Sequence, residues 1–244
     1  MKIDVLTIFP EMLEPVVQSS ISRIAQEKEL VDISVHNIRR FSDAKHGKTD
    51  DYPFGGGAGM VMTPQPLWDA LSAIFPDDVS RKRARIVFPT PDGQHFKQKT
   101  AELLAKEEHL VFICGHYKGI DQRVRDYWID QEISIGEYVL TSGEIAALVI
   151  IDAVVRLIPG VLGNSESAEG DSYSYPLLDC PWYTRPDTFH SLSVPEVLLS
   201  GHHKHILQWR IEKRREKTKI NNPRLYQRYL QQTALEDLII KGEK

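Results

Sequence analysis

The sequence has 244 residues, enough to bury a sizeable core in one large domain or two modest ones. Its net charge of −4 does not by itself indicate a nucleic-acid binder, and its two cysteines are too few for a disulfide framework, which predicts a reducing compartment. The longest apolar run, residues 144–160, is interrupted by Asp152 and Arg156 before it could span a bilayer, and the N-terminus lacks a signal-peptide cleavage site. We therefore expect a soluble, cytoplasmic protein without a membrane partner.

Apolar strand patterns alternate with helical patterns along the first two thirds of the chain. Strands are predicted at residues 2–9, 31–38, 84–90, 109–115 and 129–136. Helices are predicted at Glu11–Gln26, Pro64–Phe75, Phe96–Lys106 and Ile145–Ile158. This alternation favours an α/β domain with a mainly parallel sheet. Proline cannot continue a helix, so Pro159 ends the last one and the predicted domain covers residues 1–160.

The remaining residues differ in composition from this domain. The polar stretch "GNSESAEGDSY" at 163–173 fits neither a helix nor a strand, so residues 161–174 are predicted to form a flexible linker. Residues 175–244 begin with an irregular, proline-rich segment and then show only helical patterns. The linker could be a simple tether, or one of its carboxylates could take part in chemistry.

Positive charge is concentrated in the helical region. Residues 204–228 contain nine Lys or Arg and two Glu, a local charge of +7 in an acidic chain. This pattern could be a solvated helix face, but the interspersed Trp209, Tyr226 and Tyr229 could stack on bases. The segment therefore favours binding to RNA or DNA.

Three glycine-containing loops follow predicted strands. They are "PTPDG" (89–93), "GHYKGID" (115–121) and "SIGEYVLTSGE" (134–144), the last leading into a helix capped near Ser142. In open α/β sheets, ligands bind beyond the carboxyl ends of the strands, so these loops predict a small-molecule pocket. The glycine-rich "PFGGGAGM" (53–60) lacks the context of a P-loop or dinucleotide fingerprint, and is interpreted equally well as a ligand-approaching backbone or a surface loop.

Two further features have an ordinary structural explanation. Arg156 follows Asp152 by four residues and could pair with it on the helix, although a guanidinium in so apolar a helix needs a partner or a role. The histidines of "GHHKH" (201–205) suggest metal ligation, but no cysteine or carboxylate completes a ligand set, so we predict no metal site there.

Taken together, the motifs resemble the TrmD family, the bacterial tRNA (guanine-N1)-methyltransferases of the SPOUT class. The resemblance rests on "IFPEM", "FGGGAGM", "GHYKGID", "SIGEYVLTSGE", "IDAVVRLIPGVLG", "SAEGDSY", "LLDCPWYTRP" and "LSGHH", in the family's order over most of the chain. It implies methyl transfer from S-adenosylmethionine to N1 of the guanine immediately 3′ of the anticodon. It also implies an α/β sheet with a C-terminal trefoil knot, which chains seldom form, followed by a small all-helical domain that binds tRNA.

The resemblance also assigns roles to residues. The cofactor-binding residues would be Thr90, Pro91, Gly115, Tyr117, Ser134, Ile135, Gly136, Tyr138, Leu140 and Gly143. Asp171 matches the family's proposed general base, in a linker that tRNA would order, and Arg156 matches the arginine that stabilises the reacting guanine. From the residues alone, Glu166 and Glu169 would be equal candidates for the base. The family further implies a homodimer with active sites between subunits. It also implies a divalent ion such as Mg²⁺, for which the sequence shows no ligand cluster.

Two positions depart from the family's pattern. Lys118 stands where the family commonly has a glutamate that accepts from the donor edge of the guanine, and lysine is a donor only. Ser142 stands where glycine is usual. Lys118 motivates the alternative hypothesis of an RNA-binding relative that has lost activity. A dinucleotide-dependent oxidoreductase would fit the α/β pattern. The sequence lacks the glycine fingerprint of that class, however, and the basic segment would have no explanation.

Overall fold

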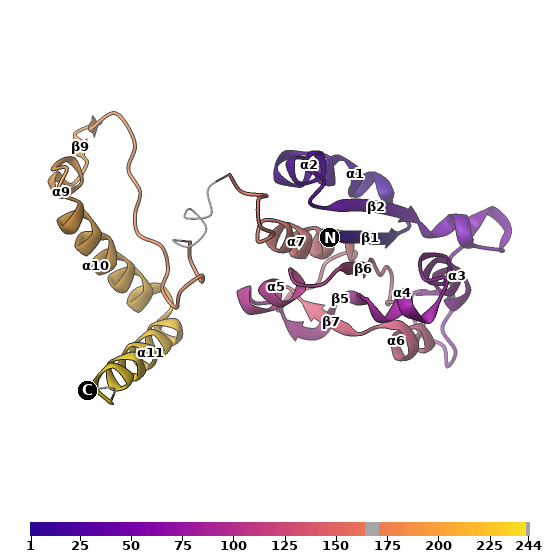
Figure 1. The fold of residues 1–244 in the computed structure, drawn as a ribbon. Helices are drawn as coiled ribbons and strands as arrows, with labels where there is room; N and C mark the ends of the chain where they lie inside the picture. Colours follow the sequence, from indigo (N-terminus) through magenta and orange to yellow (C-terminus); the bar gives the residue numbers. More distant parts are fainter. Residues whose placement is uncertain (164–170, 243–244) are drawn as a thin grey trace. The chain divides into compact units, whose positions relative to one another are not determined.

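The computed structural model describes residues 1–163 and 171–242, and the chain divides into two compact units (Figure 1). The first unit is Met1–Gly163 and the second is Asn164–Lys244. Val161 belongs to the core of the first unit and is 2% exposed, so the packed structure continues slightly beyond residue 160.

Five parallel strands form the sheet of the first unit, in the order β2-β1-β6-β5-β7. They are β1 (Lys2–Thr7), β2 (Asp32–Asn37), β5 (Ala84–His95), β6 (His109–Ile113) and β7 (Gln131–Ser134). All five predicted strands, and the parallel α/β architecture, are therefore confirmed. β5 continues past its predicted end because its pairing with β7 shifts register between Pro89 and Gln94, which leaves the four residues between them as a bulge at the carboxyl end.

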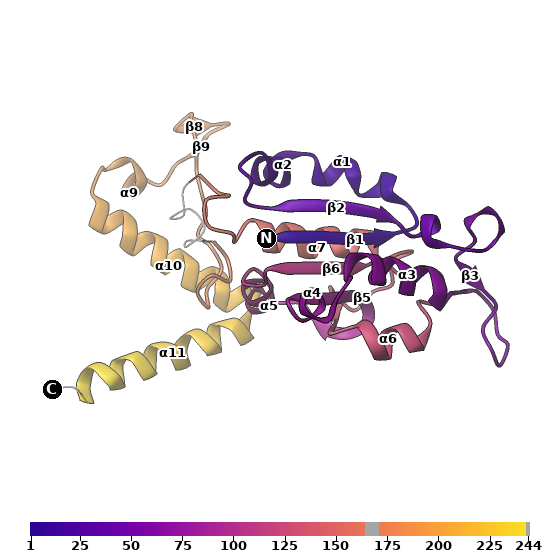
Figure 2. The ribbon, with the colours of Figure 1, turned by 45° about the vertical axis from the view of Figure 1, so that its right-hand side comes forward.

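Helices cover both faces of this sheet (Figure 2). They are α2 (Ser20–Glu27), α5 (Gln98–Leu104) and α7 (Glu144–Val155) on one face, and α3 (Pro64–Ile74) and α6 (Gln122–Trp128) on the other. The alternation of strand side chains explains the two layers: in β6, Leu110 and Phe112 pack in the first core while Val111 and Ile113 pack in the second. Every one of these four side chains is fully buried.

The helices of the first unit differ from the predictions, since one predicted helix is divided and the short helices α4 (Asp78–Lys82) and α6 were not predicted. The predicted helix Glu11–Gln26 is divided into a 3-10 turn (Pro10–Met12), α1 (Glu14–Val17) and α2, because the chain turns at Ser20, which has a φ of 48°. The pattern analysis also missed α6. Its start carries a local signal, since the Asp121 carboxylate accepts from the Arg123 N–H at 2.9 Å as an N-cap.

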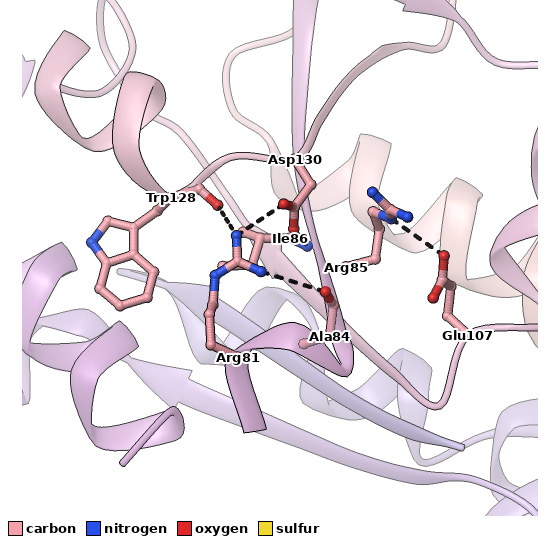
Figure 3. A network of polar contacts seen from close by, with 7 residues as sticks. All are labelled: Arg81, Ala84, Arg85, Ile86, Glu107, Trp128 and Asp130. Atoms are coloured by element: carbon pink, nitrogen blue, oxygen red, sulfur yellow. Dashed lines mark hydrogen bonds and ion pairs between the residues drawn. The ribbon is translucent and has the colours of Figure 1, made fainter. Parts of the chain in front are cut away.

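A cluster of polar contacts lies at the amino ends of β5 and β7 (Figure 3). Arg81, on the short helix α4 (Asp78–Lys82), donates to the Trp128 carbonyl at 3.0 Å and to the Asp130 carboxylate at 2.9 Å. The other carboxylate oxygen of Asp130 accepts from the Ile86 N–H at 2.7 Å. These contacts join α4, β5 and the segment before β7 at the edge opposite the carboxyl ends of the strands.

A second polar cluster lies within the sheet, around Asp4 of β1. The carboxylate is fully buried and accepts from His36 of β2 and His109 of β6, both at 2.6 Å, and from Lys2 at 2.9 Å. Burial alone would raise the pKa of Asp4, but the hydrogen bonds from these three partners outweigh it and hold the pKa far below its usual value. The ionised carboxylate therefore joins three elements of the sheet.

Replacing Asp4 by Asn is expected to lower the free energy of unfolding at neutral pH by about 3 kcal/mol, because the variant removes the buried charged acceptor of three hydrogen bonds. A depressed pKa contributes stability above the unfolded-state pKa, so the difference from wild type should shrink as the pH falls below about 4. Denaturant unfolding at several pH values measures this. The exposed Asp32→Asn is the matched control; equal stability losses in the two variants would contradict the prediction.

The second unit is mainly helical. It contains α9 (Glu196–Leu199), α10 (His203–Asn221), α11 (Pro223–Gly242) and a short hairpin of β8 (Thr188–Phe189) and β9 (Leu192–Ser193). The predicted helices are confirmed, whereas the hairpin was not predicted. Among the described helices of either unit, none combines the length and the apolar character needed to cross a bilayer.

The aromatic residues of the second unit only partly match the prediction. Tyr229 is 6% exposed, and its hydroxyl accepts from Arg215 at 2.8 Å, so it supports the helix pair and offers no open face to a base. Trp182, which the pattern analysis did not single out, is 64% exposed, and Arg210 lies over its ring at 4.6 Å. An exposed ring beside a guanidinium is the arrangement that favours base stacking.

Candidate active site

A cavity of about 330 Å³ lies beyond the carboxyl ends of β5, β6 and β7. Its walls are the three loops that follow these strands, as the sequence predicts. The lining includes all ten predicted cofactor residues: Thr90, Pro91, Gly115, Tyr117, Ser134, Ile135, Gly136, Tyr138, Leu140 and Gly143. Residues up to 53 positions apart in the sequence thus meet at one place, and the volume is at the lower end of the range for small-molecule sites.

Backbone packing between two of the loops forms one side of the cavity. The Gly143 N–H donates to the Gly115 carbonyl at 2.9 Å, and Ser142 forms a bridge with His116. A Cβ added at Gly143 would lie 2.8 Å from the Gly115 nitrogen and 2.9 Å from the Cys114 Cα. Only glycine fits at position 143, whereas Ser142 is accommodated, so the departure at Ser142 leaves this packing intact.

The glycine-rich stretch 53–60 is part of the same region. It connects β3 (Asp50–Asp51) to β4 (Val61–Met62), and the Lys118 N–H donates to the Met60 carbonyl at 3.0 Å. A Cβ on Gly59 would lie 3.1 Å from Lys118 Cγ, so the lysine stem packs directly on the glycine. A Cβ on Gly55, Gly56 or Gly57 would meet nothing within 4 Å, so the choice between a ligand-approaching backbone and a surface loop stays a prediction. Lys118 itself is exposed and lines the cavity.

A buried acid lies behind the cavity wall. Glu144, the first residue of α7, is fully buried, and its Oε1 accepts from the Thr7 hydroxyl at 2.5 Å and from His116 Nε2 at 2.8 Å. Burial by itself raises the pKa of the Glu144 carboxyl, but the interactions with His116, Thr7 and Ser142 outweigh it and hold the pKa below its usual value. The sequence analysis missed Glu144 and His116. The available signal was an acid directly before a strongly apolar helix.

The two predicted catalytic residues lie in different units. Arg156 is the C-cap of α7 and is half-buried, with its N–H bonded to the Asp152 carbonyl at 3.2 Å. Asp171 begins the described part of the second unit, where its carbonyl accepts from the Ser174 N–H at 3.3 Å and hydroxyl at 2.6 Å. Each makes further polar contacts. Glu166 and Glu169 lie outside the described residues.

Among the side chains that the structure describes, neither the histidine cluster nor any other group forms a metal-ligand set. The rings of His202 and His205 stack on each other at 4.6 Å. Within residues 1–163 and 171–234, no group of three or more His, Cys, Asp or Glu side chains is arranged to hold a metal ion.

The sheet order, the loop-built cavity and the basic segment 204–228 are typical of α/β proteins with a small-molecule site at the carboxyl ends of the strands and a surface suited to an anionic polymer. The family model described as "tRNA (Guanine-1)-methyltransferase TrmD" matches residues 1–228. The chain belongs to this family, which is of the SPOUT class.

Curated relatives agree with the family assignment. Proteins called "tRNA (guanine-N(1)-)-methyltransferase" from Bacillus cereus (strain AH820), Bacillus anthracis (strain A0248) and Bacillus thuringiensis subsp. konkukian (strain 97-27) are each 52% identical to it over 225 residues. The alignments cover 92% of this chain and 91% of each relative.

Proposed function

We propose that this chain transfers a methyl group from S-adenosylmethionine to N1 of the guanine immediately 3′ of the anticodon in tRNA. The observation that carries the proposal is the convergence of ten residues from three separate loops on one cavity, in a chain of this family. The names of the 52% identical relatives support the same reaction.

The cavity of about 330 Å³, lined by loop backbone and by Tyr117 and Tyr138, is the proposed cofactor site. Bound S-adenosylmethionine supplies a methyl group on a sulfonium, which is already activated toward a nucleophile. The backbone of the 134–143 loop and of Gly115 would hold it, with Tyr138 folded over Gly136 and its hydroxyl bonded to the Ile135 carbonyl at 3.2 Å. Because the methyl needs little activation, the protein contributes mainly orientation and exclusion of water.

The target nitrogen must lose its proton to a group of the protein. Guanine N1 carries a proton that must leave as the nitrogen attacks, and Asp171 is the residue proposed to accept it. Negative charge then develops toward O6, where the guanidinium of Arg156 would stabilise it. A base in the segment next to the unit boundary would make catalysis depend on correctly bound tRNA.

The second unit is proposed to hold the tRNA. α10 and the start of α11 carry all nine Lys and Arg residues of the +7 segment, and Arg210 with the exposed Trp182 adds a stacking surface. Cations bind the phosphate backbone without regard to sequence, so this unit would supply affinity and the cavity would supply specificity.

A homodimer is proposed because α7 leaves large apolar side chains exposed. In α7, Ile145 and Val149 are 46% and 44% exposed although the helix is apolar on every side. Two large apolar side chains one helical turn apart would be covered by a second copy of the chain. We also propose the trefoil knot of the SPOUT class, with the tight packing of Gly143 against Gly115 as the supporting contact.

Methylation of an unmodified tRNA transcript with labelled cofactor, followed by mapping of the modified base, tests the function. Label at N1 of the guanine 3′ of the anticodon is expected. Calorimetry with S-adenosylmethionine tests the alternative that Lys118 motivates, because an RNA-binding relative without activity need not bind the cofactor, whereas the proposed enzyme must. Label on another base would contradict the proposal.

A further inference from the structure

A directed chain of hydrogen bonds ends at the cavity. The Phe9 N–H donates to Thr7 Oγ1 at 2.8 Å, so the Thr7 hydroxyl has its hydrogen available for Glu144 Oε1 at 2.5 Å. The same oxygen lies 2.8 Å from His116 Nε2. The chain connects the end of β1, the start of α7 and the loop after β6.

The chain fixes which ring nitrogen of His116 carries a hydrogen toward Glu144. An ionised carboxylate only accepts hydrogen bonds, so His116 Nε2 must carry the hydrogen that it shares with Glu144. In the neutral ring, Nδ1 then presents a lone pair. Nδ1 makes no hydrogen bond within the described residues, although the His116 side chain is only 10% exposed and lines the cavity.

Maintaining this arrangement has an energetic cost. Glu144 Oε2 is buried and has no partner in good hydrogen-bond geometry among the described residues, although the Ser142 hydroxyl is near enough to help lower the pKa of the carboxyl. An unsatisfied buried acceptor costs about 1–3 kcal/mol, so a purely structural contact between α7 and β1 would be made more stably by apolar side chains. The cost indicates that the orientation of His116 has a use.

The target guanine has hydrogen-bond donors that require an acceptor such as His116 Nδ1. Guanine presents N1–H and the N2 amine as donors, and Asp171 is proposed to take only the N1 proton. Lys118 is a donor and cannot accept from the amine. Among the described residues that line the cavity, the one carboxylate is that of Asp92, which is 67% exposed and bound to Arg125 at 3.2 Å. His116 is the enclosed side chain with a lone pair fixed in place.

We propose that His116 accepts a hydrogen bond from the exocyclic amine of the target guanine through Nδ1, and that Glu144 and Thr7 are positioning residues that act through it. The proposal rests on the proposed function and identifies a residue that selects guanine over bases without the amine. Phe9 contributes by packing, since its ring centroid lies 5.0 Å from that of His116.

Inosine at the target position provides the test, because it keeps N1–H and O6 but lacks the amine. Wild type is expected to methylate the guanine transcript with a kcat/KM at least about tenfold above that of the inosine transcript, the factor for one hydrogen bond to an enclosed group. His116→Leu should lose most activity on guanine and bring the ratio near one. His116→Asn, whose amide oxygen can take the place of Nδ1, should restore much of the preference.

The positioning residues have their own matched pair. Thr7→Val should reduce the guanine preference, while Thr7→Ser should retain it, because only the serine hydroxyl can relay the hydrogen bond. A fold defect would lower activity on both transcripts equally and would not change the ratio. Calorimetry and thermal unfolding of each variant in the presence of S-adenosylmethionine follow cofactor binding and folding separately.

Three results would overturn the inference. They are an unchanged guanine-to-inosine ratio in His116→Leu, a wild-type ratio near one, and a loss of cofactor affinity in His116→Leu with the ratio preserved, which would place the histidine against the cofactor. Failure of the proposed function would be different, since wild type would then leave N1 unmodified in both transcripts.

Discussion

Replacing Asp171 by Ala is expected to slow methyl transfer by about 10²–10⁴-fold, the range for loss of a positioned general base. Without the carboxylate, the N1 proton must leave to solvent while the lone pair of N1 remains delocalised into the ring. Affinity for S-adenosylmethionine should be unchanged, because Asp171 is not one of the residues proposed to hold the cofactor. Single-turnover assays with saturating tRNA measure the chemical step, and calorimetry measures cofactor binding.

Glu166→Ala and Glu169→Ala are the matched controls, since both remove a carboxylate from the same stretch of sequence. Each should reduce turnover much less than Asp171→Ala. Near-normal turnover by Asp171→Ala, or an equal loss in one of the glutamate variants, would remove Asp171 from the role of base.

The role proposed for Arg156 constrains the geometry of this step. A guanidinium paired directly with a carboxylate lowers the pKa of the acid and makes it a weaker base. Arg156 should therefore face the guanine O6 when tRNA is bound. A bidentate pair between Arg156 and Asp171 in a tRNA complex would count against the division of roles.

The sequence predicted the parts of the fold that local patterns encode. Alternation of short apolar runs with helical periodicity was sufficient for all five strands and for their parallel arrangement, because buried parallel strands have few polar residues. The loops after the carboxyl ends of the predicted strands then indicated where the cavity lies. A helix such as α6 was missed because its exposed face is charged, and only the cap at Asp121 marks where it begins.

Contacts between distant residues could not be predicted in this way. Glu144 and Thr7 are 137 residues apart, and neither has a pattern that indicates the other. The same holds for Asp4, which appears in sequence as a polar interruption of a strand and in the structure joins three elements of the sheet. Buried polar residues acquire their partners from topology, so they are visible only after the sheet order is known.

The close packing at Gly143 leads to a prediction that depends on the folded backbone alone. Replacing Gly143 by Ala is expected to lower the affinity for S-adenosylmethionine by about tenfold to a hundredfold. The new Cβ would be within 3.0 Å of two backbone atoms, Gly115 N and Cys114 Cα. Neither can rotate away as a side chain could, so the 115–121 and 134–144 loops must separate, at a cost of about 1–3 kcal/mol.

Calorimetry measures the change in affinity, and thermal unfolding without ligand shows how much of it comes from general destabilisation. Gly163→Ala is the control, because nothing lies within 4 Å of a Cβ at that position and its φ is not in the left-handed region. That variant should bind the cofactor as wild type does. If Gly143→Ala bound S-adenosylmethionine equally well, the contact between the two loops would not shape the cofactor site, and the support that this contact gives to the trefoil knot would be lost with it.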